Sequence, residues 1–324
     1  MQKIGILLTN TGTPTAATAR AVRCYLRQFL SDKRIVHLPR LLWLPLLYGL
    51  ILPFRSHRSA KLYQAIWTPH GSPMRITMQT IRTELEKAFC NQSPHSIEIE
   101  IGMNYGEPSI PEALDKLQQK KINKLIALPL FPQYSNSTTA SSFDRLQEAL
   151  KDWSVLPELH FIRDYAAHPD YIAALANSIQ SKWQTQPPSE HLLISFHGLP
   201  KRFLKKGDPY ALQCEQTAHL LAAKLNLPQE KWTACYQSKF GYDAWLQPST
   251  QALLTELPQR GIKTVDVICP GFSVDCLETL EEIAQSGQKI FLAAGGKSLC
   301  YFPALNENAE HIHLFMQLIS SSGQ

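Results

Sequence analysis

The sequence predicts an α/β fold of two pseudo-symmetric Rossmann-like domains, each a four-stranded parallel sheet flanked by helices. Three observations lead to this expectation. Apolar runs of strand length alternate with helical patterns, and a βαβα order implies a parallel sheet with helices on both faces. The chain has 324 residues, which suits two domains of about 150 residues each. One eight-residue pattern occurs twice, as LLTNTGTP at 7–14 and LISFHGLP at 193–200.

Each half of the chain supplies four short apolar runs that we interpret as strands. In the first half the strands are expected at 4–8, 96–101, 124–130 and 158–162, and the helices at 17–30, 74–89 and 110–119. In the second half the strands are expected at 191–196, 233–237, 264–270 and 289–294, and the helices at 171–183, 275–285 and 307–319.

A second repeated pattern locates the domain boundaries. A Pro-x-Phe pattern follows the repeated stretch in both halves, in PLFPQYS at 129–135 and PGFSVDC at 270–276. The distance along the chain from the eight-residue pattern to the Pro-x-Phe pattern is longer in the first half. An insertion near 37–72 accounts for the excess. We therefore expect a first domain at 1–155 that carries this insertion and a second at 156–305. A C-terminal helix at 306–324 would pack back on the first domain.

The insertion contains LLWLPLLYGLILPF at 41–54, which is apolar throughout and lies between Arg40 and Arg55. It is too short to span a bilayer, which needs about 20 residues, and its Pro and Gly residues would interrupt a helix. One interpretation is a buried core helix or loop. The other is an exposed apolar lip that covers a hydrophobic ligand or enters a membrane surface, with Arg40, Arg55 and Arg58 near headgroups.

Composition excludes some classes of protein. The net charge is +5 and the basic residues are scattered, which argues against nucleic acid as a partner. The seven cysteines have no CxxC spacing, and the N-terminus lacks the features of a secretory signal. Reduced thiols in a cytoplasmic protein are therefore expected. No GxGxxG, Walker A or GxSxG sequence occurs, which disfavours dinucleotide, P-loop and serine hydrolase chemistry.

His197 is the first candidate for chemistry. It ends an apolar strand and is followed at once by Gly198 and Pro200. If the halves are pseudo-symmetric, His197 corresponds to Thr11, and both strand-end loops would face a cleft. A partly desolvated imidazole there can accept a proton or bind a metal. The alternative is a turn histidine with a purely structural role.

Glu278 and Glu282 are the second candidates. They are spaced i, i+4 on a helix that Asp275 could cap, and Glu281 lies at the edge of the same face. Like charges at this spacing do not stabilise a helix, but they suit a cation that passes along it. The alternative is ordinary acids in a first helical turn. An imidazole with carboxylates suits Fe²⁺, Co²⁺ or Zn²⁺, and so few ligands fit a metal in transit better than a stored one.

Polar and aromatic residues follow several strands and suggest an aromatic, apolar ligand. Each of these positions also fits an ordinary polar loop. The candidates are Tyr105, Tyr134, Ser135, Gln237, Ser238, Trp245 and Phe272.

Together these stretches resemble the ferrochelatase family, particularly its proteobacterial branch. The matching motifs are SFHGLP followed by KRFLKKGDPY at 195–210, PGFSVDCLETLEEI at 270–283, PQYSNSTT at 132–139 and QSKFG with Trp245. The resemblance implies a chelatase-like fold and the insertion of Fe²⁺ into protoporphyrin IX, which gives protohaem and two protons in the terminal step of haem biosynthesis. Fe²⁺ is then a substrate, and no organic cofactor is implied.

The resemblance also implies roles for individual residues. His197 would act at the metal and the pyrrole nitrogens, with Glu278 as its partner carboxylate across the macrocycle and Glu282 on an acidic track. Thr11, Tyr105, Tyr134, Ser135, Gln237, Trp245 and Phe272 would contact porphyrin. The segment 41–54 would cover the porphyrin and touch the inner face of the cytoplasmic membrane, which makes the protein cytoplasmic and peripherally membrane-associated.

The sequence departs from the family's pattern at three positions. Thr11 stands where relatives have Tyr, Met or Leu, Asn104 where many have Arg, and Cys276 where many eukaryotic members have His. No cysteine cluster follows Cys300, so we expect no iron–sulfur centre. Two alternatives remain: a chelatase for another tetrapyrrole, such as coproporphyrin or a cobalt-accepting corrinoid precursor, and a non-catalytic porphyrin or haem carrier.

Overall fold

The computed structural model describes residues 3–92, 96–240 and 243–322, and these form two compact units. Unit 1 comprises Met1–Leu130, Asn136–Arg163 and Ile312–Gln324, and unit 2 comprises Phe131–Ser135 and Asp164–His311. The domain boundaries that we placed at 155 and 305 stay predictions. Among the described residues no helix is long and apolar enough to cross a membrane.

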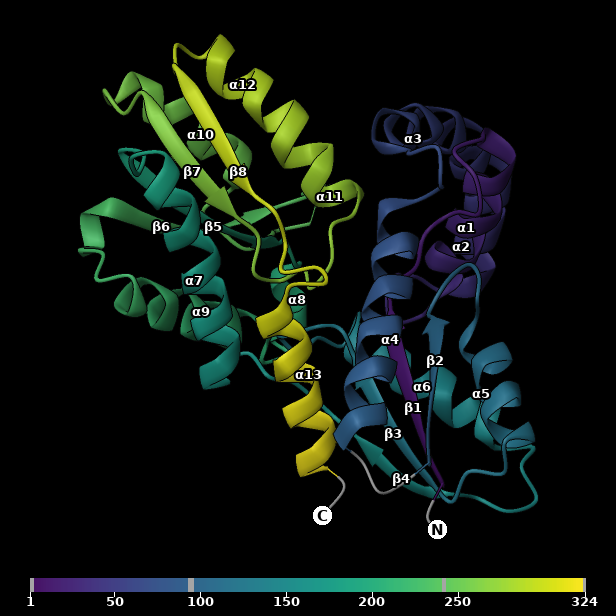
Figure 1. Cartoon of the computed structure of the whole chain (residues 1–324). Coiled ribbons are helices and arrows are strands. Elements are labelled where there is room, and N and C mark those ends of the chain that lie inside the picture. The colour runs from purple at the N-terminus through teal and green to yellow at the C-terminus, as the bar shows by residue number, and fades with distance from the viewer. Residues whose placement is uncertain (1–2, 93–95, 241–242, 323–324) are drawn as a thin grey trace. The chain divides into compact units, whose positions relative to one another are not determined.

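Unit 1 is built on a four-stranded parallel sheet in the order β2-β1-β3-β4 (Figure 1). The strands are β1 (Lys3–Asn10), β2 (Ser96–Met103), β3 (Lys124–Pro129) and β4 (Glu158–Phe161). β1 is buried along almost its whole length because helices cover both faces of the sheet. The four strands predicted for the first half are confirmed to within a few residues.

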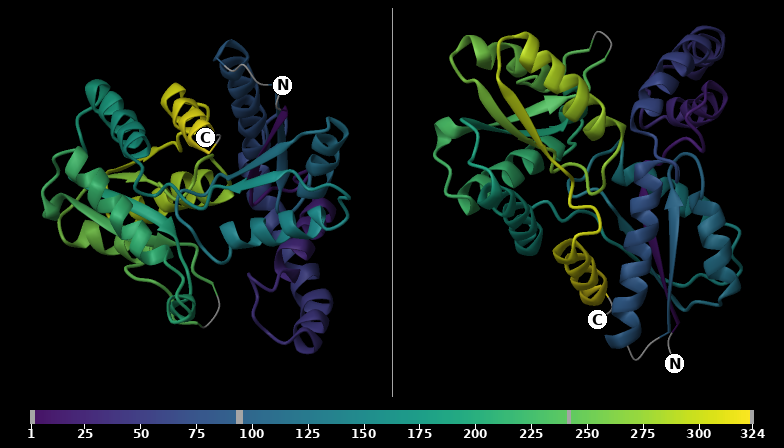
Figure 2. Two further views of the ribbon diagram at one scale, coloured as in Figure 1. Left: turned by 90° about the horizontal axis from the view of Figure 1, so that it is seen from below. Right: turned by 45° about the horizontal axis from the view of Figure 1, so that its top comes forward.

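Helices α5 (Ile110–Gln119) and α6 (Thr139–Leu150) pack on one face of this sheet, where Leu7, Leu114 and Leu146 share one apolar cluster. The other face carries α4 (Pro73–Gln92) (Figure 2). A capping box at Ser109 and Glu112 fixes the start of α5. Helix α1 (Ala19–Ser31) packs against α3 (Leu52–Ile66).

The insertion is helical from Arg40 to Ile66, which corrects our expectation that its prolines would interrupt a helix. It forms α2 (Arg40–Leu46), the π-helical turn η1 (Leu47–Ile51) and α3. Pro45 lies inside α2, and Pro53 is the second residue of α3, directly after the π-helical turn η1. A widened turn follows Pro45 and lets the helix continue.

Unit 2 repeats the topology of unit 1, with a parallel sheet in the order β6-β5-β7-β8. The strands are β5 (His191–His197), β6 (Trp232–Gln237), β7 (Thr264–Ile268) and β8 (Ser298–Phe302). The predicted internal repeat is thus a repeat of fold. The predicted eighth strand at 289–294 is wrong, because that apolar run forms helix α12 (Gln288–Ala293) and the strand follows it.

One face of the second sheet is covered by α10 (Thr250–Gln259), the π-helical turn η3 (Glu282–Gly287) and α12, which share an apolar cluster around Val265, Val267 and Phe291. Helix α7 (Pro169–Thr185) packs against α9 (Tyr210–Lys224), and α9 contacts β6. The remaining helices are α8 (Lys201–Leu204), the 3₁₀ turn η2 (Gln229–Lys231), α11 (Leu277–Leu280) and α13 (Ala309–Ser321).

Candidate active site

β5 ends at His197, whose imidazole is half-buried and held by the following turn. The Nδ1 atom lies 2.7 Å from the carbonyl oxygen of Gly198, and the N–H of Gly198 donates to the carbonyl of Gln237 at 2.7 Å. A Cβ at position 198 would lie 2.6 Å from that same carbonyl, so the close approach of the two strand ends requires glycine. The Phe272 ring lies 6.3 Å from the imidazole, between ring centroids.

Gln237 joins this strand end to the segment that carries the glutamates. Its Oε1 accepts a hydrogen bond from Ser195 at 2.8 Å, and its Nε2 donates to the carbonyl of Glu278 at 2.6 Å. Gln237 is only 3% exposed, so its amide is committed within the protein. Its role as a porphyrin contact stays a prediction; in the structure its side chain links Ser195, two residues before His197, to the Glu278 backbone.

Ser238 holds the carboxylate of Glu282 with two donors. Its N–H donates to one carboxylate oxygen at 2.7 Å and its hydroxyl to the other at 2.5 Å. Burial raises the pKa of Glu282, and Glu278 raises it further, while the hydrogen bonds of Ser238 and the nearby charge of His197 oppose the rise. The structure thus places Glu282 within electrostatic reach of both predicted catalytic residues.

The helix predicted at 275–285 differs in two respects. Asp275 does not cap it: Cys276 is the N-cap, and the buried carboxylate of Asp275 accepts hydrogen bonds from Thr279 and Tyr301. The helix also widens into η3 at Glu282, so the glutamates do not lie on one regular α-helical face. At this turn the Ser286 N–H donates to the carbonyl of Glu281, five residues earlier, which is the hydrogen bond of a π-helical turn.

Trp245 lies behind the His197 turn and is 5% exposed. It forms an isolated antiparallel bridge with Pro200, and its ring would contact a Cβ at Gly198 at 3.1 Å. Phe240, which is 49% exposed, packs 5.0 Å from the Trp245 ring. Gly241 of the QSKFG motif lies outside the described residues.

Tyr134 and Ser135 belong to unit 2, where they contact the start of α9. The N–H of Tyr134 donates to Gln213 at 2.6 Å, and the hydroxyl of Ser135 donates to Asp208 at 3.1 Å. Tyr134 is half-buried and Ser135 is 2% exposed. Asp208 lies in the quoted GDPY motif, but sequence reasoning gave it no role.

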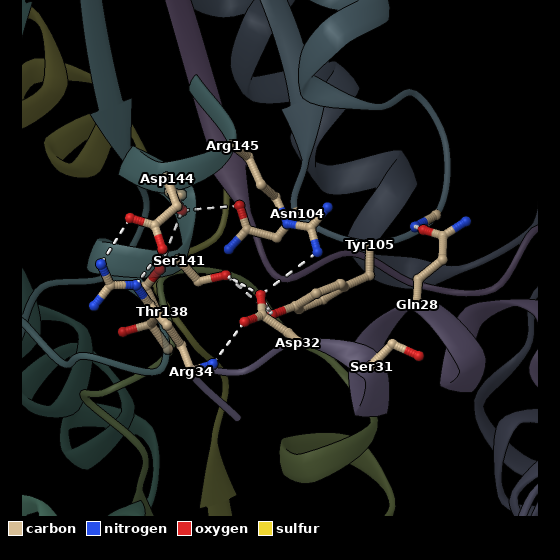
Figure 3. Close-up of polar contacts among 12 residues, drawn as sticks. Gln28, Ser31, Asp32, Arg34, Asn104, Tyr105, Thr138, Ser141, Asp144 and Arg145 are labelled. Carbon is tan, nitrogen blue, oxygen red and sulfur yellow. Dashed lines mark hydrogen bonds and ion pairs between the residues drawn. The ribbon is translucent and has the colours of Figure 1, made fainter. Parts of the chain in front are cut away.

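Tyr105 lies inside unit 1 in a polar network (Figure 3). Its hydroxyl donates to Asp32 at 2.8 Å, Ser141 donates to the same carboxylate oxygen at 2.7 Å, and the Arg145 guanidinium lies 4.5 Å from the Tyr105 ring centre. Burial opposes ionisation of Asp32, but the hydrogen bonds from Ser141, the Arg34 N–H and Tyr105 prevail and lower its pKa. Nothing in the sequence pattern identified Asp32 or Arg145 as partners of Tyr105.

Thr11 follows β1 as His197 ends β5, so the two residues occupy equivalent places in the two sheets. Thr11 is half-buried, and its N–H donates to the side chain of Asn10 at 2.7 Å. In the part of the chain that the structure describes, no three His, Cys, Asp or Glu side chains are arranged to hold a metal ion.

Comparisons with known proteins agree with this architecture. The ferrochelatase family model matches residues 3–322. The ferrochelatases of Vibrio cholerae serotype O1 and Aeromonas hydrophila subsp. hydrophila are 51% and 50% identical, over 98% of this chain and 98% of each relative. The sirohydrochlorin chelatase SirB from Bacillus subtilis subspecies spizizenii, in complex with cobalt, superposes with a TM-score of 0.57 at 9% identity, covering 99% of this chain and 95% of that one. This last likeness shows the fold, and the first three show that the chain belongs to the ferrochelatase family.

Proposed function

We propose that this chain inserts Fe²⁺ into protoporphyrin IX and releases protohaem and two protons, the terminal step of haem biosynthesis. Membership of the ferrochelatase family, which makes the chain a metal chelatase and thus a lyase, supports this function. The observation that carries the residue assignment is the arrangement at the end of β5. There Gln237 and Ser238 tie the His197 turn to Glu278 and Glu282.

The chemistry requires two N–H protons to leave the macrocycle and a hydrated cation to lose water. His197 is the proton acceptor in this proposal, because its Nδ1 lies against the carbonyl of Gly198 while its Nε2 makes no hydrogen bond among the described residues. Glu278 replaces water around the cation, and Glu282 lies on the acidic track that delivers the cation or removes protons. A site that binds the bent form of the porphyrin better than the planar form lowers the barrier to insertion.

The test is anaerobic Fe²⁺ or Zn²⁺ insertion into protoporphyrin IX, followed by the Soret shift. We expect turnover in the wild type and a loss of about 10²-fold or more in His197→Ala and in Glu278→Gln. Glu281→Gln is the matched control, since the Glu281 carboxylate accepts a hydrogen bond from Ser286 and has no role in the proposal. Full activity of both site variants would contradict the assignment.

The same assay separates the alternatives. Preference for coproporphyrin, or for Co²⁺ with a corrinoid precursor, would indicate a chelatase for another tetrapyrrole. Tight binding of porphyrin without turnover would indicate a carrier.

We propose that porphyrin contacts come from Thr11, Phe272 and Tyr134, which are half-buried. The other four predicted contacts are buried, and each would support the loop that contacts the porphyrin: Tyr105, Ser135, Gln237 and Trp245. Titration of porphyrin fluorescence distinguishes the two groups. Phe272→Ala should weaken porphyrin binding, and it should also lower the free energy of unfolding because the ring packs against the apolar cluster of unit 2.

We propose that the segment 41–54 binds the inner face of the cytoplasmic membrane. It is amphipathic: Trp43, Leu47 and Leu52 are buried, whereas Leu41, Leu42 and Phe54 are 90%, 72% and 71% exposed. Arginines at both ends of the segment suit anionic headgroups. Such a surface fits an interfacial helix that lies on the membrane.

Sedimentation with vesicles of phosphatidylcholine and phosphatidylglycerol tests this surface. The triple variant Leu41→Ser, Leu42→Ser, Phe54→Ser should lose vesicle binding and keep its stability. Leu212→Ser is the control, because Leu212 is also 72% exposed but lies in unit 2. Equal binding by the wild type and the triple variant would contradict the proposal.

We propose further that the protein is cytoplasmic, has no nucleic-acid partner, and uses neither an organic cofactor nor an iron–sulfur cluster. The chain's cysteines support the last point: Cys214, Cys235, Cys269 and Cys276 are buried free thiols whose pKa burial raises, and a thiol must lose its proton to bind iron. Iron and sulfide analysis of the purified active protein tests this.

A further inference from the structure

β5 extends beyond one of its two neighbours in the sheet. Its pairing with β7 ends at Ile194 and Ile268, whereas its pairing with β6 continues to His197 and Gln237. In a parallel strand the N–H and C=O of one residue point to the same neighbour, and successive residues alternate. Because Gly198 donates to β6, the carbonyl of His197 points to the side where β7 has already ended.

Tyr210 supplies the donor that β7 does not. Its hydroxyl donates to the carbonyl of His197 at 3.0 Å. The side chain is 8% exposed, and burial raises the pKa of Tyr210 well above its usual range, so the hydroxyl keeps its proton. Asp208 supports Tyr210 by accepting from its N–H at 3.0 Å, and the same carboxylate accepts from Ser135.

The peptide group between His197 and Gly198 is therefore held on both sides. Tyr210 donates to its C=O, and its N–H donates to the carbonyl of Gln237. The imidazole is fixed to the next carbonyl, because Nδ1 lies 2.7 Å from the oxygen of Gly198. A carbonyl only accepts hydrogen bonds, so the hydrogen of the neutral ring is on Nδ1 and the lone pair is on Nε2.

We propose that Tyr210 is a positioning residue for His197: it fixes the His197–Gly198 peptide, keeps the ring in the Nδ1–H form, and leaves Nε2 as the atom that takes protons from the substrate. This inference rests on the proposed function. Without the Tyr210 hydroxyl the peptide can rotate, Nδ1 loses its fixed partner, and both neutral tautomers become populated. Only one of these offers a base at Nε2.

The test compares Tyr210→Phe with Tyr236→Phe. Tyr236 is a matched control because it is also a buried tyrosine of unit 2, and among the described residues its hydroxyl makes no hydrogen bond with the His197 turn. Three quantities are measured: kcat for Zn²⁺ insertion, the Kd of protoporphyrin, and the ¹⁵N chemical shifts of the His197 ring, assigned by their loss in His197→Ala. The ring shifts report the tautomer independently of turnover.

In the wild type we expect the ring shifts of the neutral imidazole to place its hydrogen on Nδ1 and none on Nε2. In Tyr210→Phe we expect averaged ring shifts and a kcat lower by about 10-fold to 10²-fold, part of the usual contribution of a general base. The Kd of porphyrin should change by about threefold or less, which is well under one tenfold step. Tyr236→Phe should keep the wild-type shifts and kcat.

Two results would overturn the proposal. One is a wild-type His197 with its hydrogen on Nε2. The other is a Tyr210→Phe variant whose shifts and kcat match those of Tyr236→Phe. If Tyr210→Phe does not fold, Asp208→Asn takes its place, with the same signs expected. Absence of turnover in the wild type would instead contradict the proposed function, and the ring shifts would still test the role of Tyr210.

Discussion

Glu282 is a buried carboxylate, and among its neighbours Ser238 does most to keep it ionised. Burial raises its pKa, and the two hydrogen bonds from Ser238 limit that rise because they stabilise the charged form. The backbone N–H remains in any variant, but the hydroxyl does not. Ser238 also adopts a φ of 63°, in the left-handed region, which aims both donors at the same carboxylate.

Ser238→Ala should therefore raise the pKa of Glu282 further, because the charged form loses one hydrogen bond. If ionised Glu282 carries the cation, the acid limb of the kcat–pH profile moves to higher pH. Ser286→Ala is the control, since its hydroxyl serves Glu281. If the acid limbs of Ser238→Ala and the wild type coincide, ionisation of Glu282 has no part in the reaction.

Substitution of glycine by alanine should have opposite effects on the free energy of unfolding at Gly198 and at Gly49. A Cβ at Gly198 meets a backbone oxygen at 2.6 Å, whereas a Cβ at Gly49 meets nothing within 4 Å. Gly198→Ala should lower the free energy of unfolding by about 1–3 kcal/mol through overpacking. Gly49→Ala, in a helical turn, should raise it by about 0.5–1 kcal/mol. Urea denaturation measures both, and equal effects would show that the His197 turn can relax.

At the residue scale the sequence predicted which residues lie close together, while their roles in the reaction and in porphyrin binding stay predictions. His197, Glu278 and Glu282 share one strand end and the helix beside it, as expected. Tyr105 and Gln237 stood out in the sequence for the same reason, as polar residues just past strands, yet their polar atoms bond other protein groups. A polar side chain past a strand can face a ligand or satisfy the fold, and only the packing decides which.

Among the elements, β8 shows where sequence pattern misleads. KIFLAA at 289–294 is short and apolar, which suits either a strand or a buried helix. Phe291 of this run packs in the core while its neighbours Lys289 and Leu292 are exposed, so the spacing is helical. The true strand, SLCYF, follows a turn at Gly295, whose φ is 95°. Two short candidates so close together could not be ranked by composition alone.

Helix α2 is held to the end of α1 by donors to unpaired carbonyls. Trp43 Nε1 donates to the carbonyl of Leu30 at 2.7 Å, and Arg40 donates to that of Ser31. The last carbonyls of a helix lack partners within it, so these bonds satisfy groups that would otherwise need water. They fix the base of the exposed apolar segment.

Trp43→Phe should lower the free energy of unfolding by about 1–3 kcal/mol, because it leaves a buried carbonyl without its donor. Tyr48→Phe is the control, since Tyr48 is 45% exposed in the same insertion. Urea unfolding of the two variants gives the comparison. A Trp43→Phe protein as stable as Tyr48→Phe would mean that water replaces the indole.

On the scale of the whole molecule, one buried histidine couples stability to pH. His311 is fully buried, and burial lowers its pKa to about 4, although its hydrogen bond to the carbonyl of Asn306 opposes this shift. In the unfolded chain the same group titrates near pH 6.5. Between these values the unfolded state binds a proton that the folded state does not, so stability falls as the pH falls.

The expected loss is about 3 kcal/mol between pH 6.5 and pH 4, and the contribution is fully present above pH 6.5. Urea denaturation at several pH values measures this slope. His311→Asn, which keeps a donor for Asn306, should flatten it. His313→Ala, an exposed histidine two residues on, should leave it unchanged. If the free energy of unfolding of His311→Asn depends on pH as it does in the wild type, a group other than His311 titrates.

The assignment of chain segments to the two units bears on how the protein is made. Unit 1 contains Ile312–Gln324, and unit 2 contains Phe131–Ser135 from within the first half. A ribosome therefore releases the last piece of unit 1 only after all of unit 2 has emerged. A protein truncated after His311 therefore keeps every segment of unit 2 and lacks one segment of unit 1. We expect limited proteolysis of this truncated protein to leave the His197 strand intact and to cleave near β1.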